Sequence, residues 1–330
     1  MTGEPLAFDD ESQPPEPRSK FDAVLTMLRP PNLPTAWADI LLGYWMVQWE
    51  EPWGKPATLA SLLVASSGFY LAGMVWNDVF DVETDRRERP DRPIPSGDVS
   101  LSFARTLAVI LTVVGIGAAA LPGAASLVVA LVLTAAILFY DAFAKNYPFG
   151  PLAMGLCRAL NVMLGASLAL PAILHIGEAT PPQLPLGADA LVWSTYWWSF
   201  PAGNGLYIAG ATLLSRQEVF RGRREGILAG ALVMAAGFAL HAWSLSKIPR
   251  LESPVWIVGG FAALTVGFRV MRALANPAPR LVQTAVGSAI VSLIMIDAAL
   301  LLAVRGQMQA MVVVCLLPLS VFFARWYYST

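Results

Sequence analysis

The chain has 330 residues, of which 56% are hydrophobic and 14% are charged, and its mean hydropathy is +0.58. Soluble domains carry about 25% charged residues, so this composition argues against a water-soluble globule and indicates a membrane protein. The 22 basic and 23 acidic residues nearly balance, which argues against nucleic acid as a partner. With two cysteines and two histidines, a disulfide scaffold or a His- or Cys-based metal site is not expected.

Residues 1–20 are acidic and rich in proline, and they contain no apolar run of signal-peptide length. We expect them to form a disordered tail in front of one membrane domain over residues 21–330. Apolar segments of helical length then predict an all-α bundle of nine or ten transmembrane helices. They lie at 34–49, 57–76, 103–121, 124–141, 152–175, 198–214, 227–245, 255–274, 284–304 and 309–326.

The positions of the basic residues predict how the bundle is oriented. If the N-terminus is cytoplasmic, 18 Lys and Arg residues lie at cytoplasmic ends of the predicted spans. The other four, Lys55, Lys247, Arg250 and Arg305, lie at outer ends. Because cytoplasmic loops collect positive charge, this asymmetry predicts an even number of spans in the cell membrane, with the N-terminus inside.

The sequence WNDVFDVETDRRERPDRPIPSG, residues 76–97, follows the second apolar segment. Asp78, Asp81 and Asp85 are spaced i, i+3 and i+7, which places them on one face of a helix, with the Asn77 amide beside them. Such carboxylates repel one another unless a cation compensates them, and Mg²⁺ prefers oxygen ligands of this kind. The prolines that follow end the helix and turn Arg92 back toward the carboxylates.

The alternative for this stretch is an acidic helix end whose carboxylates pair with neighbouring arginines along the same helix. A carboxylate directly after the apolar run GFYLAGMVW is expensive to desolvate, and this favours a functional role. We therefore predict a Mg²⁺ site at Asp78, Asp81 and Asp85.

The pattern N-D-x-x-D-x-x-x-D, followed by R-x-x-R-P-I-P-S-G, resembles the first aspartate-rich motif of the UbiA superfamily of intramembrane prenyltransferases. The segments GLCRALNVMLG and LLSRQEV resemble the EboC-like branch of that superfamily. The resemblance implies a helical bundle around a central cavity that opens to the cytoplasm and laterally to lipid. It also implies that the motif binds Mg²⁺ and, through the ion, a polyprenyl diphosphate.

The family's second acidic motif, D-x-x-x-D-x-x-x-G, is expected in LLSRQEVFRGRREG. Glu218 matches its first acid and Gly226 its glycine, but Gly222 stands where the second Asp is expected. The resemblance implies that Glu218 is a metal ligand, and Arg216 and Arg223 add positive charge that could bind phosphate. An arginine-rich loop is also what a cytoplasmic position produces.

Two further basic residues are candidates for binding the leaving diphosphate. Lys145 resembles the lysine of the family's Y-x-x-x-K-R signature, with Asn146 in place of the arginine. Arg158 lies one turn inside an apolar helix, where an unpaired cation is costly. Either side chain would place a cation on the anionic leaving group. The alternative for both is ordinary anchoring at the membrane interface.

The resemblance makes Asn32 and Asp39 candidates for the floor of the cavity, because the family's first helix has a polar start and faces that cavity. Asp297 is a carboxylate near the middle of a predicted span. Such a carboxylate either acts in function or pairs with a neighbouring helix. Tyr140, or Phe139 beside it, could stabilise an allylic cation by a cation–π interaction.

Together these features predict an enzyme that transfers a prenyl group from a polyprenyl diphosphate to an unidentified small-molecule or lipid acceptor among membrane lipids. Mg²⁺ and the side chains of Arg92, Lys145 and Arg158 would neutralise the departing diphosphate. Two alternatives remain open at this point. One is transfer of a phosphoribosyl group to a polyprenyl phosphate, and the other is a non-catalytic lipid-binding or transport protein.

Overall fold

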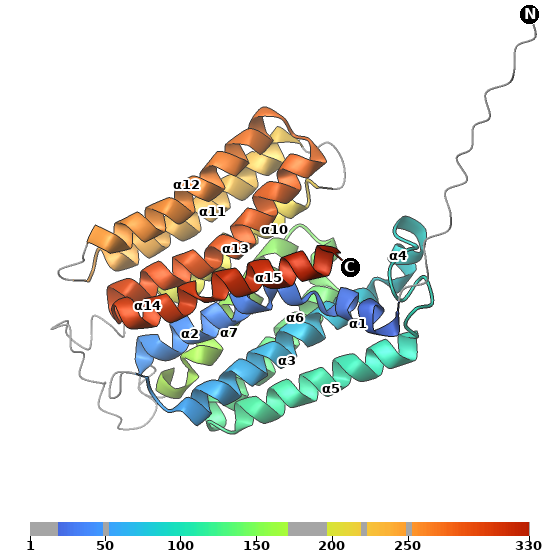
Figure 1. The fold of residues 1–330 in the computed structure, drawn as a ribbon, viewed down its shortest axis with the longest axis horizontal. Coiled ribbons are helices and arrows are strands. Elements are labelled where there is room, and N and C mark those ends of the chain that lie inside the picture. Colours follow the sequence, from blue (N-terminus) through green and yellow to red (C-terminus); the bar gives the residue numbers. More distant parts are fainter. Residues whose placement is uncertain (1–18, 49–52, 171–196, 219–222, 249–252, 330) are drawn as a thin grey trace, which may run out of the picture.

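A computed structural model describes residues 19–48, 53–170, 197–218, 223–248 and 253–329, so the predicted tail lies almost wholly outside the described residues. The described residues are helical and contain no strand, which confirms the predicted all-α bundle (Figure 1). The helices are α1 (Lys20–Leu28), α2 (Leu33–Val47), α3 (Pro56–Phe80), α4 (Val82–Glu88), α5 (Leu101–Ala120), α6 (Ala124–Ala142), α7 (Gly150–Gly165), α10 (Ser199–Ser215), α11 (Arg224–Leu245), α12 (Ser253–Ala275), α13 (Pro279–Val304), α14 (Gln307–Val314) and α15 (Leu316–Ser329). Three short 3-10 helices join them, η1 (Pro30–Asn32), η2 (Ala144–Asn146) and η3 (Ser167–Ala169).

Within the described residues, each of the ten predicted apolar segments overlaps a helix, and residues 49 and 171–175 of two segments lie outside the described residues. Six described helices, α3, α5, α6, α11, α12 and α13, are long and apolar enough to cross a membrane. The last predicted segment is divided at Cys315 into α14 and α15. Pro318 explains the break, because it has no N–H to donate to the carbonyl of Val314 four residues earlier.

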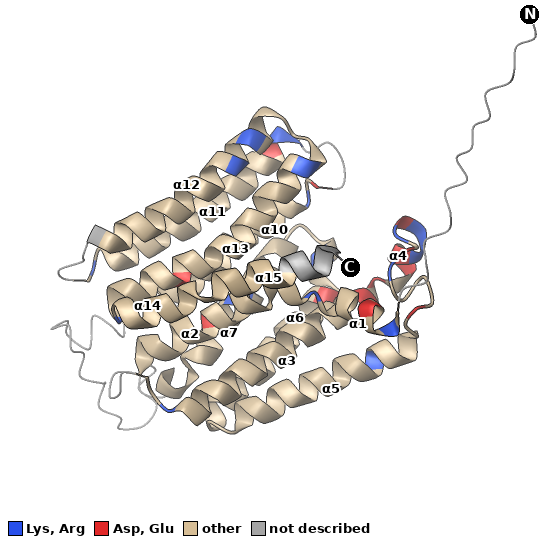
Figure 2. Cartoon of the chain, in the orientation of Figure 1, with Lys and Arg blue, Asp and Glu red and all other residues tan. Residues whose placement is uncertain are grey.

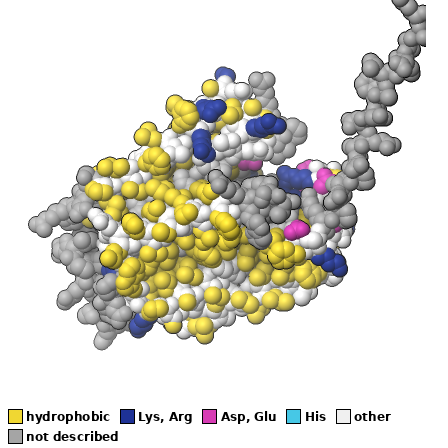
Figure 3. All heavy atoms as spheres, in the orientation of Figure 1, with side chains coloured by type: hydrophobic (Ala, Val, Ile, Leu, Met, Phe, Trp, Pro, Cys, Tyr) yellow, Lys and Arg dark blue, Asp and Glu magenta, His cyan; other side chains and the backbone are white. Residues whose placement is uncertain are grey.

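Burial separates the central helices from the peripheral ones. The most apolar stretch of α13 is 72% buried, whereas those of α5 and α12 are 22% buried. α2 packs against α3, α7 and α13 and buries nearly all of its side chains. α5 and α12 therefore present apolar side chains outward, as helices in contact with lipid do. Figure 3 shows the same pattern, with hydrophobic side chains covering the flank of the bundle.

α2 and α7 approach each other closely because glycines lie at their contact. A Cβ atom added at Gly43 would lie 2.1 Å from the carbonyl oxygen of Val162, and one at Gly165 would lie 2.5 Å from that of Ile40. Small residues at such a crossing allow two backbones to pack directly. This contact sets the distance between the polar side chains that α2 and α7 carry toward each other.

Lys, Arg, Asp and Glu residues gather toward the end of the bundle at which α4 and the start of α11 lie (Figure 2). Most of the helical ribbon away from that end consists of uncharged residues. The asymmetry matches the one that the sequence predicts. The assignment of that end to the cytoplasm stays a prediction.

Candidate active site

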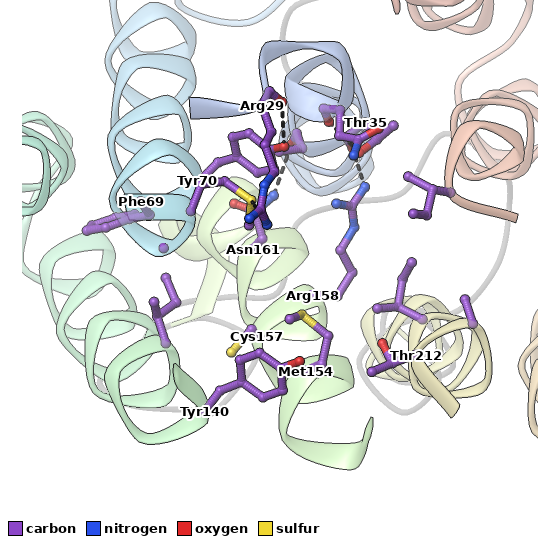
Figure 4. A pocket seen from close by; sticks show the side chains of 18 of the residues that line it. Arg29, Thr35, Phe69, Tyr70, Tyr140, Met154, Cys157, Arg158, Asn161 and Thr212 are labelled. Atoms are coloured by element: carbon purple, nitrogen blue, oxygen red, sulfur yellow. Dashed lines mark hydrogen bonds between the residues drawn. The ribbon is translucent and has the colours of Figure 1, made fainter. Parts of the chain in front are cut away.

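A cavity of about 400 Å³ lies among α2, α3, α6, α7, α10 and α13 (Figure 4). Pockets for small ligands range from about 300 to 1,000 Å³ and are mostly apolar with a few polar groups. The lining fits that description, because side chains such as Phe69, Leu133 and Ile137 form much of its wall. Its polar and ionisable side chains are Arg29, Asn32, Thr35, Ser66, Tyr70, Tyr140, Asp141, Cys157, Arg158, Asn161, Thr212 and Ser215.

The three aspartates of the motif lie across a helix break. α3 ends at Phe80 and α4 begins at Val82, with Asp81 between them. The backbone N–H groups of Asp81 and Asp85 still donate to the carbonyls four residues earlier, at 3.0 and 2.8 Å, so the helical register continues through the break. Asp78 and Asp85 are consequently buried on one side. The Asp81 side chain is 26% exposed.

Arginines from two segments neutralise the two buried carboxylates. Oδ1 of Asp78 accepts from Nη2 of Arg29 at 2.8 Å and from Nη1 of Arg92 at 3.0 Å. The same Nη1 of Arg92 donates to Oδ2 of Asp85 at 2.8 Å. α4 ends at Glu88, and the proline-containing turn behind it returns Arg92 to the carboxylates. One guanidinium group therefore lies between Asp78 and Asp85.

A lysine neutralises the third carboxylate. Nζ of Lys145, on η2 directly after α6, lies 2.7 Å from Oδ1 of Asp81 and donates to the carbonyl oxygen of Asn77 at 3.5 Å. The Asn77 side chain points to the cavity side, where its Nδ2 donates to Oδ1 of Asp141 at 3.1 Å. Asn77 thus links the acidic motif to a residue of the cavity wall.

The three carboxylates of the motif are of the chemical type that binds Mg²⁺. Across the described residues, no group of three or more His, Cys, Asp or Glu side chains is arranged to hold a metal ion, and each of the three aspartates faces an arginine or a lysine. The guanidinium group of Arg92 lies between Asp78 and Asp85, so a positive charge is already bound there. Carboxylate oxygens are hard ligands of the type that Mg²⁺ selects. Asp78, Asp81 and Asp85 are the residues that would hold such an ion.

Arg158 reaches the cavity wall from α7 and pairs with α2. Its Nε lies 2.6 Å from Oδ2 of Asp39, and its Nη2 donates to the carbonyl oxygen of Thr35, as the dashed line in Figure 4 marks. Nδ2 of Asn161, one turn along α7, donates to the same Asp39 oxygen at 3.0 Å. The Arg158 side chain is therefore held in place while part of it lines the cavity.

The polar contacts continue away from the cavity into the centre of the bundle. Nδ2 of Asn204, on α10, donates to Oδ1 of Asp39 at 3.2 Å and to Oδ1 of Asp297, on α13, at 2.8 Å. Asp39, Asn204 and Asp297 have no solvent-exposed surface. Of the two possibilities for Asp297, the structure shows pairing with a neighbouring helix.

The remaining predicted residues divide into those at the cavity and those outside it. Asn32 and Tyr140 line it, whereas Phe139 is exposed on the surface in an aromatic cluster. Nη2 of Arg216 donates to the carbonyls of Lys145 and Tyr147, at 3.0 and 2.7 Å, and so ties the end of α10 to η2.

Glu218 and Arg223, from the segment of the second acidic motif, lie outside the cavity lining. Gly222 lies outside the described residues. The Arg223 side chain is 83% exposed and lies 3.4 Å from Glu225. Glu218 is half-buried, and this burial raises the pKa of its carboxyl group, although the positive charge of Arg89 opposes the shift. Among the described residues, Arg223 pairs with Glu225, and Glu218 belongs to no group of three or more His, Cys, Asp or Glu side chains that could hold a metal ion.

Two residues at the site, Arg29 and Asp141, were not identified from the sequence. Arg29 ends α1 in the left-handed conformation with φ 47°, and its carbonyl accepts from the Tyr70 hydroxyl at 2.8 Å. No local pattern marks that contact. The sequence does contain a feature that could have identified Asp141. It is a carboxylate in the last turn of a predicted span, the same feature that marked Asp78 as a candidate.

Comparisons with known proteins bear on the family and the fold of this chain. A family model described as UbiA prenyltransferase family matches residues 33–211. Two relatives are named digeranylgeranylglyceryl phosphate synthase. That of Methanoculleus marisnigri is 34% identical over 148 residues, which are 44% of this chain and 52% of the relative. That of Metallosphaera sedula is 43% identical over 94 residues, 28% of this chain and 33% of the relative. The chain thus spans about half the length, or less, of these curated relatives.

Solved structures share the fold at low sequence identity. A structure described as that of digeranylgeranylglyceryl phosphate synthase in membranes has a TM-score of 0.59 at 17% identity, covering 87% of this chain and 99% of its own. A UbiA homologue from Archaeoglobus fulgidus, described as bound to GPP and Mg²⁺, has a TM-score of 0.54 at 14% identity, covering 82% and 99%. These similarities confirm the arrangement of the helices.

Proposed function

The chain belongs to the UbiA prenyltransferase family, and on this premise we propose that it transfers a prenyl group from a prenyl diphosphate to the hydroxyl group of a lipid acceptor. One observation carries the proposal. A rim of three carboxylates, each facing a cation, borders a largely apolar cavity within a membrane bundle. A prenyl diphosphate has the same division into a charged head and an apolar chain.

Asp78, Asp81 and Asp85 would hold Mg²⁺ at the rim. When bound, the ion would neutralise negative charge on the diphosphate and so favour its departure. The structural neighbour from Archaeoglobus fulgidus that is described as bound to GPP and Mg²⁺ supports this choice of ion and substrate class.

Arg29, Arg92 and Lys145 would bind the phosphate oxygens. In the structure these three side chains pair with the carboxylates at 2.7 to 3.0 Å. Carboxylates that bind an ion no longer need these partners, so the guanidinium and ammonium groups become available to the diphosphate. Charge on the leaving group is then stabilised by donors that are already in position.

The apolar part of the cavity would hold the prenyl chain and exclude water from its first carbon, C1. Phe69, Leu133 and Ile137 supply this surface. As the bond from C1 to the diphosphate breaks, positive charge develops on the allylic carbons. The Tyr140 ring, which lines the cavity, can stabilise that charge through a cation–π interaction.

The acceptor would be a glycerol lipid that carries a phosphate. The relatives' name describes a product with two geranylgeranyl groups on one glyceryl phosphate, and such a product forms when a prenyl group is added to a glyceryl hydroxyl. Arg158 also lines the cavity wall, and the N–H groups of its guanidinium that are not engaged with Asp39 or Thr35 would bind the polar part of this lipid.

The test uses purified protein in detergent with radiolabelled geranylgeranyl diphosphate, geranylgeranylglyceryl phosphate and Mg²⁺. We expect diphosphate release and a doubly prenylated lipid, loss of both in EDTA, and a rate at least about 100-fold lower in Asp78→Asn. Glu83→Gln is the matched control, because the Glu83 carboxylate is exposed and pairs with Arg86. It should keep the wild-type rate.

Three results would overturn the proposal. Full activity in EDTA or in Asp78→Asn would contradict the proposed Mg²⁺ site. Binding of the diphosphate without turnover would favour a transport or lipid-binding protein. Incorporation of label from phosphoribosyl diphosphate into a polyprenyl phosphate would favour phosphoribosyl transfer.

A further inference from the structure

Asp141 is the one carboxylate among the described residues that line the cavity. It lies in the last turn of α6 and is 3% exposed. In the part of the chain that the structure describes, its one hydrogen-bond partner is the Asn77 amide, at 3.1 Å. A carboxylate at the edge of an apolar span is costly to bury, so its presence there calls for a role.

The other acidic groups near the cavity are already engaged. Asp78 and Asp81 pair with Arg29, Arg92 and Lys145 at the rim. Asp39 and Asp297 are fully buried behind the wall, and Asp39 pairs with Arg158.

The charges that act on Asp141 lie on three different segments. They belong to Lys145 on η2, Asp81 between α3 and α4, and Arg29 at the end of α1. The two cations among them are paired with the rim carboxylates, so neither forms an ion pair with Asp141. Its uncharged titratable neighbours are Tyr140 on α6 and Cys157 on α7, both in the cavity wall.

Asn77 sets the position of Asp141 relative to the diphosphate site. This amide is adjacent in sequence to Asp78, and it holds the Asp141 carboxylate on the cavity side of the rim. C1 of a prenyl diphosphate is bonded to the diphosphate, so it must lie next to the rim. The attacking atom of the acceptor must reach the same region.

We propose that Asp141 is a catalytic residue that binds the hydroxyl group of the acceptor and takes its proton during prenyl transfer. The proposal rests on the proposed function. The bond between C1 and the diphosphate oxygen breaks, and its electron pair leaves with the diphosphate. A lone pair of the acceptor oxygen forms the new bond to C1, and the O–H proton passes to the Asp141 carboxylate, which later returns it to water.

This role also defines the class of acceptor. A hydroxyl nucleophile must lose a proton, so it needs a base within hydrogen-bond reach. A polyprenyl phosphate attacks through an oxygen that is already anionic and needs none. A carboxylate in the cavity wall therefore favours a hydroxyl acceptor over phosphoribosyl transfer to a lipid phosphate.

The experiment compares wild type, Asp141→Asn and Asp141→Glu, with Asp98→Asn as the control. Asp98 is a carboxylate that accepts from Ser96 on the loop after α4, outside the cavity lining. Mg²⁺-dependent binding of geranylgeranyl diphosphate is measured first, and Asp141→Asn should bind it within about twofold of wild type. Transfer to geranylgeranylglyceryl phosphate should fall in kcat by about 100-fold or more, as expected for loss of a general base.

Two further measurements separate a base from a structural residue. The kcat/KM of wild type should rise with pH as the base ionises, and the residual rate of Asp141→Asn should lack that dependence. Asp141→Glu keeps the carboxylate and should be about 10-fold faster than Asp141→Asn.

A wild-type kcat in Asp141→Asn, or equal loss of donor binding and transfer, would overturn the role of Asp141 alone. If the wild-type protein releases no diphosphate, the proposed function fails, and the role of Asp141 fails with it.

Discussion

Glu218 is a half-buried carboxylate in the turn after α10, and Arg89 is the charge that acts on it from the end of α4. Burial disfavours its ionised form and raises its pKa, while Arg89 opposes this only in part. The folded protein therefore binds this proton more tightly than the unfolded chain does. Its stability falls as the pH rises through the interval between the two pKa values.

Glu218→Gln should remove this dependence. In EDTA, we expect the variant to have a higher unfolding temperature than wild type at pH 7 and the same one at pH 4, where wild-type Glu218 is protonated in the folded protein. Thermal unfolding of both proteins in detergent at the two pH values measures this difference in unfolding temperature. A lower unfolding temperature at pH 7 would show that ionised Glu218 stabilises the protein.

The same variant tests the second acidic motif. If Glu218 binds a metal ion, Glu218→Gln should lower the transfer rate by about 10-fold or more, which is about 1.4 kcal/mol per factor of ten. A wild-type rate would show that the first motif works without this ligand.

At the scale of helices, the contact between α2 and α7 determines the position of Arg158. Gly43 and Gly165 allow the two backbones to meet, and Asp39 on α2 then reaches Nε of Arg158 on α7 at 2.6 Å. A methyl group at either glycine would collide with backbone, which cannot move aside without separating the helices.

Gly43→Ala should destabilise the protein by about 1–3 kcal/mol, the usual cost of overpacking. Gly260→Ala is the matched control, because that glycine is also in a helix and has nothing within 4 Å of the added Cβ. The control should be neutral or slightly more stable, since Ala favours helix over Gly. Equal unfolding temperatures for the two variants would contradict the proposed role of the contact.

The network behind Arg158 joins α2, α7, α10 and α13 through two carboxyl groups and one cation. Asp39→Asn leaves Arg158 without its carboxylate, and removing one partner of a buried ion pair costs about 3–5 kcal/mol. Asp297→Asn changes a residue that accepts from Asn204 and has no ion pair among the described residues, so its cost should be smaller. Denaturant unfolding in detergent compares the two, and a larger loss in Asp297→Asn would contradict this assignment.

At the scale of the whole molecule, the distribution of charge predicts the orientation in the membrane. Eighteen of the 22 Lys and Arg residues fall at one set of predicted helix ends. The aspartates of the first motif lie at that set of ends, as does Glu218, so a diphosphate and Mg²⁺ from the cytoplasm could reach the rim only if it faces inward.

Cysteine labelling of intact cells tests the orientation. On a background of Cys157→Ala and Cys315→Ser, a membrane-impermeant reagent should label Lys55→Cys, beside the exposed Trp53, but not Arg89→Cys. Both introduced cysteines should react after the cells are opened. Labelling of Arg89→Cys from outside would invert the bundle.

The helices, the family and the acidic motif could be predicted from the sequence because each depends on local order. Apolar runs of about 20 residues form helices in a membrane whatever lies beside them, and the i, i+3, i+7 spacing puts three carboxylates on one side by backbone geometry alone. The loop prolines also predicted that Arg92 returns to these carboxylates, as it does, but only the tertiary structure decided which distant cations meet them. Arg29 reaches Asp78 across 49 positions, and Lys145 reaches Asp81 from another helix end.

The cavity wall was likewise decided by packing. Asn77 meets Asp141 across 64 positions, and Asp39 meets Asn204 across 165. These distances depend on how closely α2, α3, α6, α7 and α10 pack. Glycines such as Gly43 permit that close packing, but no local sequence pattern predicts it. Arg223 is the opposite case, a residue that the sequence suggested for the site but that the fold leaves exposed. Its side chain pairs with Glu225 and has no partner at the site. Helical periodicity is a property of neighbours in sequence, whereas a binding site is a property of neighbours in space.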